Sequence, residues 1–192
     1  MNLSHRRLSG FFVATLGIAA ASFGCRASPQ EAFWSRLIAL CNNAYEGRVI
    51  ESSIPDSSLV QNRLIMYVSA CGDSAVRIPF LVGDDASRTW IVTRTADGLQ
   101  LKHEHVHADG SEDDLTGYGG ATTGAGEIGR QDFPADTETA RLLPAAARNV
   151  WTLEVIPDEW FAYSLRREGT DRRIRIEFDL SQTVTPPAAP HH

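Results

Sequence analysis

Apolar and polar residues alternate along most of the chain after residue 43, the pattern of β-strands that are buried on one face. The clearest case is 173–180, where apolar residues at every second position alternate with charged ones. The same period predicts strands at 44–51, 64–71, 75–82, 89–95, 99–107, 140–143, 150–156 and 161–167. Turn signals separate these runs, Asp97-Gly98 among them, and no helices alternate with the strands. The pattern therefore favours an antiparallel sheet.

One segment with helical spacing precedes the strands. Ser28 is suited to cap a helix, Pro29 fits its first turn, and Glu31 completes a capping box. The apolar residues that follow at helical spacing are Phe33, Trp34, Leu37, Ile38 and Cys41. We expect one amphipathic helix that ends near 42–43 and packs its apolar side against the sheet.

Eight or nine antiparallel strands in chain order predict an all-β meander that closes into a barrel, with the N-terminal helix at one end. Closure removes the two exposed edges that an open sheet would present. A two-sheet β-sandwich is the alternative. Phe33-Trp34 ahead of the short helix and 45–47 (Tyr-Glu-Gly) at the first strand resemble the opening of lipocalin-like (calycin) barrels. The Gly-x-Trp motif of lipocalins is absent. The resemblance otherwise extends to the order of elements and implies the same barrel.

A glycine-rich segment at 110–138 interrupts the rhythm of the strands. Six of its glycines are Gly117, Gly119, Gly120, Gly124, Gly126 and Gly129. We expect a long connection, which in a barrel would be a lid or a loop at the mouth. Long loops of this kind are usually functional or disordered. The barrel domain is expected to span 31–184, followed by a proline-rich, disordered tail at 185–192.

The first 24 residues have the three parts of a bacterial secretory signal. Arg6 and Arg7 precede an apolar stretch at 8–21, and small residues lead to Cys25. The end of this segment resembles a lipoprotein signal, in which Cys25 is lipidated and becomes the new N-terminus. A tether at 25–30 then connects the lipid to the domain. We expect a lipid-anchored protein of the periplasm or outer membrane, and the alternative is a soluble secreted form cleaved after Ala21.

The three cysteines fit this interpretation. Lipidation of Cys25 leaves Cys41 and Cys71 as a pair, and an oxidising compartment allows a disulfide between them. The alternative is two buried free thiols.

The net charge of the chain limits the kinds of binding partner that we expect. The chain has a net charge of −6, and loss of two arginines with the signal leaves −8. This argues against nucleic acid, or an anionic membrane surface, as the main partner. Arginines gather on the last hairpin, at Arg166, Arg167, Arg172, Arg173 and Arg175. Nearby acids favour a paired, solvated face, and a surface for an anion or a partner is the alternative.

Three histidines share one face of a predicted strand. His103, His105 and His107 alternate with Glu104 and a valine, and two leucines on the same face favour the barrel interior. These histidines are the candidate ligand site, together with Trp90 and Trp151 as aromatic cavity residues. Imidazoles in this register are suited to Zn²⁺ or Cu²⁺. The alternative is a polar strand face that binds no metal.

No motif for nucleophilic catalysis is present, so the sequence leaves enzymatic activity open without favouring it. The favoured function is a non-enzymatic binding module for a small apolar ligand or a metal ion. The alternative is an envelope structural or interaction protein with a filled core.

Overall fold

The computed structural model describes residues 27–53, 57–107 and 109–186, and most of the elements in them are strands of one antiparallel sheet. The strands are β1 (Ala44–Ser52), β2 (Leu64–Tyr67), β3 (Ala70–Cys71), β4 (Ala75–Val82), β5 (Asp85–Thr95), β6 (Gly98–His105), β7 (Tyr118–Ala121), β8 (Arg130–Pro134), β9 (Asn149–Ile156), β10 (Trp160–Arg167) and β11 (Arg173–Asp179). The helices are α1 (Pro29–Ile38), α2 (Ser57–Gln61) and α3 (Thr137–Leu142), and a 3₁₀ turn follows at Pro144–Ala146. No helix among these residues is long and apolar enough to cross a membrane.

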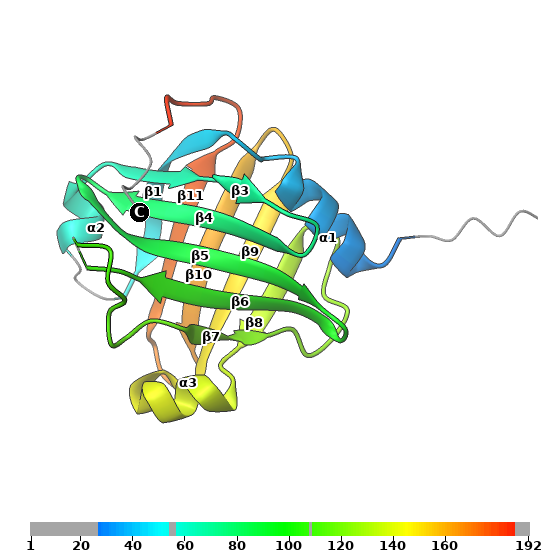
Figure 1. Ribbon diagram of the computed structural model, residues 1–192, viewed down its shortest axis with the longest axis vertical. Coiled ribbons are helices and arrows are strands. Elements are labelled where there is room, and N and C mark those ends of the chain that lie inside the picture. The colour runs from blue at the N-terminus through cyan, green and yellow to red at the C-terminus, as the bar shows by residue number, and fades with distance from the viewer. Residues whose placement is uncertain (1–26, 54–56, 108, 187–192) are drawn as a thin grey trace, which may run out of the picture.

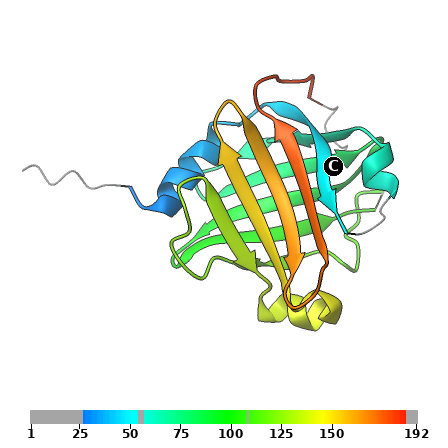
Figure 2. The same ribbon diagram turned by 180° about the vertical axis from the view of Figure 1, so that it is seen from behind.

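The sheet is a meander that is nearly closed into a barrel, which confirms the predicted fold class. Its order is β7-β6-β5-β4-β2-β1-β11-β10-β9-β8, with β3 paired to β4, so it holds eleven strands rather than eight or nine. Strands β4 to β6 cross steeply in front of β9 and β10 in Figure 1, and Figure 2 shows β8 to β11 from behind. The first and last strands pair with each other, which joins the two ends of the meander.

The centre of the barrel is packed with side chains. Phe161, Phe178, Trp151 and Ile176 from the β9–β11 wall are at most 1% exposed. The helix α1 covers one end, with Phe33 among its buried residues. The expected helix start is confirmed, since the Ser28 side chain accepts a hydrogen bond from the Glu31 amide. The helix ends at Ile38, earlier than predicted, and its start at Pro29 takes up the end of the predicted tether.

The weak joint of the barrel lies between β7 and β8. In the described part of the chain, an isolated bridge between Gly120 and Ala135 and a 3.1 Å hydrogen bond from the Asp136 amide to the Gly119 carbonyl connect these strands. Thr139 of α3 supports the joint, because its buried hydroxyl donates to the Gly119 carbonyl at 2.7 Å and accepts from the Gly119 amide. A Cβ on Gly120 would lie 1.8 Å from the Pro134 carbonyl oxygen. The two strands therefore approach each other backbone to backbone.

We expect Gly120→Ala to lower the free energy of unfolding by about 1–3 kcal/mol, because the added methyl group forces β7 and β8 apart. Urea unfolding measures the effect. Gly124→Ala is the matched control, since a Cβ at that position meets open space. Equal stability of the two variants would show that the joint does not depend on this close approach.

Two sequence predictions about the segment before β9 are wrong. Residues 140–143, expected as a strand, belong mainly to α3, whose N-cap Asp136 accepts a hydrogen bond from the Thr139 amide. The glycine-rich segment is not one long loop, because it contains β7 and β8. Both strands are short, and glycines form half of β7, so neither shows a clear alternation.

The predicted disulfide is present. Cys41, in the turn after α1, is bonded to Cys71 of β3, with 6.2 Å between their Cα atoms. Cys25, the signal at 1–24 and the end of the predicted tail at 187–192 lie outside the described residues. Export, lipidation and localisation stay predictions.

Candidate functional site

An aromatic stack forms the floor of a cavity at the end of the barrel opposite α1. The Trp90 ring of β5 stacks on Tyr163 of β10 with 4.4 Å between ring centroids and 6° between planes. Trp90 also stacks with Phe80 of β4, at 4.8 Å and 16°. Trp90 is 3% exposed. The predicted role of this tryptophan as a cavity residue agrees with its position.

His103 makes two hydrogen bonds next to the stack, and one of them is to Tyr163. Its Nδ1 lies 3.2 Å from the Tyr118 carbonyl oxygen, and its Nε2 lies 2.9 Å from the Tyr163 hydroxyl. A carbonyl can only accept, so Nδ1 carries the proton and Nε2 accepts from the Tyr163 hydroxyl. Burial lowers the pKa of His103 to about 3, against the opposing effect of the Tyr118 carbonyl. The imidazole is therefore neutral at physiological pH.

His105 lies two residues closer to the mouth and is half-buried. Its Nε2 is 3.1 Å from the hydroxyl of Tyr118, whose ring stacks on His103 with 4.5 Å between centroids. Burial and then the charge of Arg88 lower the pKa of His105. Burial raises the pKa of Tyr118 to about 12. The histidines and Tyr118 at the cavity are thus neutral hydrogen-bonding groups rather than charges.

The cavity itself has a volume of about 200 Å³. Its aromatic and imidazole lining consists of Phe80, Trp90, His103, His105, Tyr118 and Tyr163. Its aliphatic lining consists of Leu59, Leu165, Ile174 and Ile176, and its polar lining of Ser58, Arg88, Thr89 and Arg172. Two of these residues come from α2, which lies at the opposite end of the barrel from α1 in Figure 1. The space is small, mainly apolar and rimmed by arginine.

Two of the five predicted ligand residues do not line this cavity. His107 lies beyond the end of β6 with an exposed side chain, and its Nδ1 is 3.8 Å from an Asp113 carboxylate oxygen. Trp151 is 1% exposed and packs behind the site, with its ring centroid 5.2 Å from that of His103. Trp90, His103 and His105 are the predicted residues that the fold brings together there.

The three histidines do not gather around a common point. His103 and His105 bond to tyrosine hydroxyls, while His107 lies beside an aspartate outside the cavity. Across 27–53, 57–107 and 109–186, no group of three or more His, Cys, Asp or Glu residues is placed to hold a metal ion. The zinc or copper site stays a prediction from sequence spacing and gains no geometric support.

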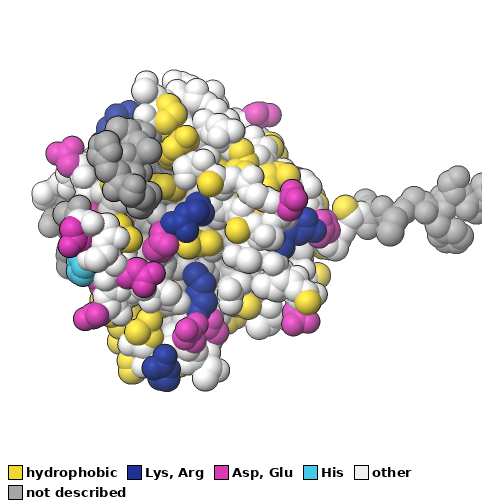
Figure 3. Space-filling model, viewed as in Figure 1, with side chains coloured by type: hydrophobic (Ala, Val, Ile, Leu, Met, Phe, Trp, Pro, Cys, Tyr) yellow, Lys and Arg dark blue, Asp and Glu magenta, His cyan; other side chains and the backbone are white. Residues whose placement is uncertain are grey.

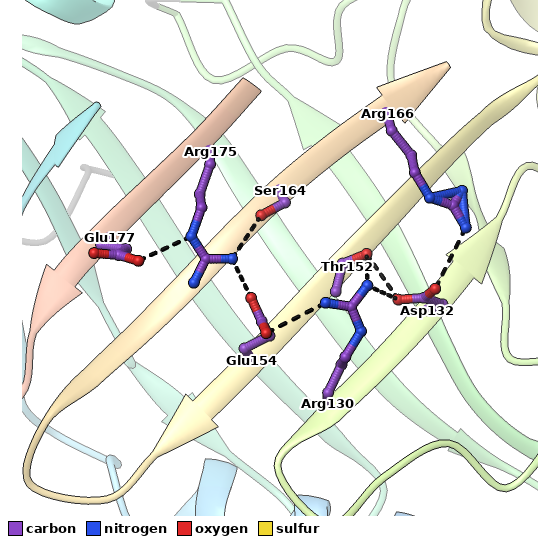
Figure 4. Close-up of polar contacts among 8 residues, drawn as sticks. All are labelled: Arg130, Asp132, Thr152, Glu154, Ser164, Arg166, Arg175 and Glu177. Carbon is purple, nitrogen blue, oxygen red and sulfur yellow. Dashed lines mark hydrogen bonds and ion pairs between the residues drawn. The ribbon is translucent and has the colours of Figure 1, made fainter. Parts of the chain in front are cut away.

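The arginines of the last hairpin are mostly paired, as their acidic neighbours suggested. Figure 4 shows alternating charges across the outer face of β8 to β11, from Glu177 through Arg175, Glu154, Arg130 and Asp132 to Arg166. Arg173 pairs with Glu51, and Arg167 donates to the Asn149 side chain. On the other wall, Figure 3 likewise shows basic side chains beside acidic ones. Most charges on the barrel surface therefore neutralise one another.

A larger groove of about 580 Å³ lies outside the barrel, over β1, β10 and β11. Four carboxylates line it, but Glu46 is paired with Arg63 and Glu177 with Arg175. It is an open groove on the outer surface of the sheet. The cavity at the α2 end is smaller but is built from buried, converging side chains, so it is the better candidate site.

Sequence reasoning missed the residues at the mouth of the cavity. Tyr118 lies in the segment read as a loop, and α2 has no periodic signal because it is only five residues long. The position of Arg88 was predictable, since it alternates in phase with Trp90 along the strand and therefore faces inward.

Comparison with known proteins finds no family model, no curated protein and no solved structure that matches this chain. The likeness to calycin barrels accordingly stays a resemblance.

Proposed function

We propose that this protein is an exported, non-enzymatic binding module that holds a small, mainly apolar ligand at the α2 end of its barrel. The observation that carries the proposal is the cavity of about 200 Å³ above the Trp90–Tyr163 stack, in a barrel whose centre is otherwise filled. Ligand sites combine an apolar lining with a few placed polar groups, and here His105 and the Tyr118 hydroxyl are such groups.

The volume of the cavity limits the size of the ligand that it can hold. Pockets for drug-sized molecules are typically about 300–1,000 Å³, and this one is below that range. A compound with one or two rings, or a short hydrocarbon chain, matches the space better than a long lipid does. The flat aromatic floor favours a planar body, because offset stacking on Trp90 adds to the burial of apolar area.

Filling the cavity should weaken ligand binding without unfolding the protein. We expect wild type to give saturation-transfer NMR signals with the neutral probes indole and 2-naphthamide, and Leu165→Trp to weaken their binding by at least about tenfold. Leu165 is only partly buried at the mouth, so the larger side chain can occupy the open space. Ile50→Trp on the outer face, where Ile50 is 45% exposed, is the matched control. Absence of any signal with wild type, or equal binding by Leu165→Trp, would contradict the proposal.

The packed barrel centre favours a second candidate, an envelope structural or interaction protein that acts through its outer surface. Phe161 and Phe178 are fully buried there, so large side chains occupy the middle of the barrel. Failure of wild type to bind the neutral probes would favour this second candidate.

A further inference from the structure

Two arginines stand at the cavity, and no carboxylate is among its lining residues. Arg88 belongs to β5 and alternates in phase with the buried Trp90 and Val92, so its side chain starts from the inward face of the strand. Arg172 lies in the turn just before β11, two residues ahead of the cavity residue Ile174. The mouth of the site is thus cationic, whereas its floor is aromatic.

Arg88 has hydrogen-bonding capacity left. Its Nη1 donates to an Asp85 carboxylate oxygen at 2.6 Å, and a guanidinium has five N–H donors in all. Its charge reaches the cavity, because after burial it is the largest influence that lowers the pKa of His105. The Asp85–Arg88 pair is partly exposed, so a ligand can approach the guanidinium from the cavity side.

Arg172 is the exception among the arginines of the last hairpin. Arg166, Arg173 and Arg175 pair with carboxylates and Arg167 donates to the Asn149 side chain. Within the described residues, by contrast, the Arg172 guanidinium has no hydrogen bond or ion pair, although it lines the cavity. Its side chain is exposed at the rim. A guanidinium held beside an apolar wall is well suited to a planar anion, which it can bind through two parallel hydrogen bonds.

We propose that the ligand is a small monocarboxylate with a flat apolar body, which lies on the Trp90–Tyr163 stack while its carboxylate meets Arg172 and Arg88 at the mouth. This inference rests on the proposed function. Charge balance selects a single negative charge, since Arg88, Arg172 and the partner Asp85 together carry +1. A monocarboxylate neutralises that remainder, and a dianion would exceed it.

The test compares carboxylates with their neutral amides on the purified protein. Calorimetry at low salt should show that 2-naphthoate binds at least about tenfold more tightly than 2-naphthamide, and benzoate more tightly than benzamide. In Arg172→Gln we expect the preference to fall below about threefold. Arg173→Gln is the matched control, because the adjacent Arg173 pairs with Glu51 away from the cavity. It should retain the full preference.

The outcomes separate this inference from the function on which it rests. Equal affinity of the acids and amides for wild type would overturn the carboxylate assignment and leave the cavity as a site for neutral ligands. A preference that persists in Arg172→Gln would place the anion elsewhere and also overturn the assignment. Failure of the neutral amides to bind wild type would contradict the proposed function itself.

Discussion

Removing the Cys41–Cys71 disulfide is expected to lower the free energy of unfolding by about 3 kcal/mol. The bridge joins residues 30 positions apart, so it removes conformational entropy from the unfolded chain. In the folded protein it ties the turn after α1 to β3, a strand of two exposed residues that pairs only with β4 among the described strands. Beside the bridge, two backbone hydrogen bonds join the same turn to Val68, two residues before β3.

Urea unfolding of Cys41→Ala/Cys71→Ala against wild type measures this contribution. The variant should still fold, because α1 keeps its buried Phe33 and Leu37 on the barrel core. Reductant should destabilise wild type by a similar amount and leave the double variant unchanged. A midpoint equal to that of oxidised wild type would show that the bridge adds no stability.

The fold class was predictable because a buried strand face imposes a period of two on the sequence. In β11, Ile174, Ile176 and Phe178 are buried while their neighbours are more exposed, as the alternation predicts. Where the strands pair through glycine the signal disappears, as in β7. A backbone that must come within contact distance of another strand has no side chain there to carry the pattern.

The candidate site was predictable as far as strand parity extends. His103 and His105 face the cavity because both lie within β6, and parity fails for His107 because the strand ends at His105. The alternation predicts which face of the sheet a side chain is on, but it does not predict where inside the barrel that side chain lies. Trp151 faces inward but lies behind His103, in a position that depends on how the two walls cross.

The arginines show where local sequence is insufficient. Acids next to them in the chain predicted paired charges, but several partners come from other strands, such as Glu51 for Arg173 and Glu154 for Arg175. Only the register of the sheet decides which arginine finds such a partner. Arg172 lies in the turn before β11 and has no such partner among the described residues, so it is the arginine of the last hairpin that is found at the cavity.

Acidification from pH 7 to pH 5 is expected to destabilise the protein by about 2 kcal/mol through His103 alone. The pKa of this histidine is about 3 in the folded protein and about 6.5 when unfolded, because burial disfavours the charged ring. Between these values the unfolded chain binds a proton that the folded protein does not, so stability falls as pH falls. His105, whose pKa is also lowered, adds to the loss in the same direction.

The window between pH 5 and pH 7 isolates the histidines, because Asp85 and Asp136 have pKa values below their usual range and titrate at lower pH. Unfolding free energies of wild type and His103→Gln across this window measure the effect. The glutamine does not titrate, so the variant should be less stable at pH 7 but should lose about 2 kcal/mol less than wild type on going to pH 5. Parallel pH profiles for wild type and His103→Gln would mean that His103 is not held neutral by the barrel, and the neutral His103–Tyr163 hydrogen bond beside the aromatic floor would then be wrong.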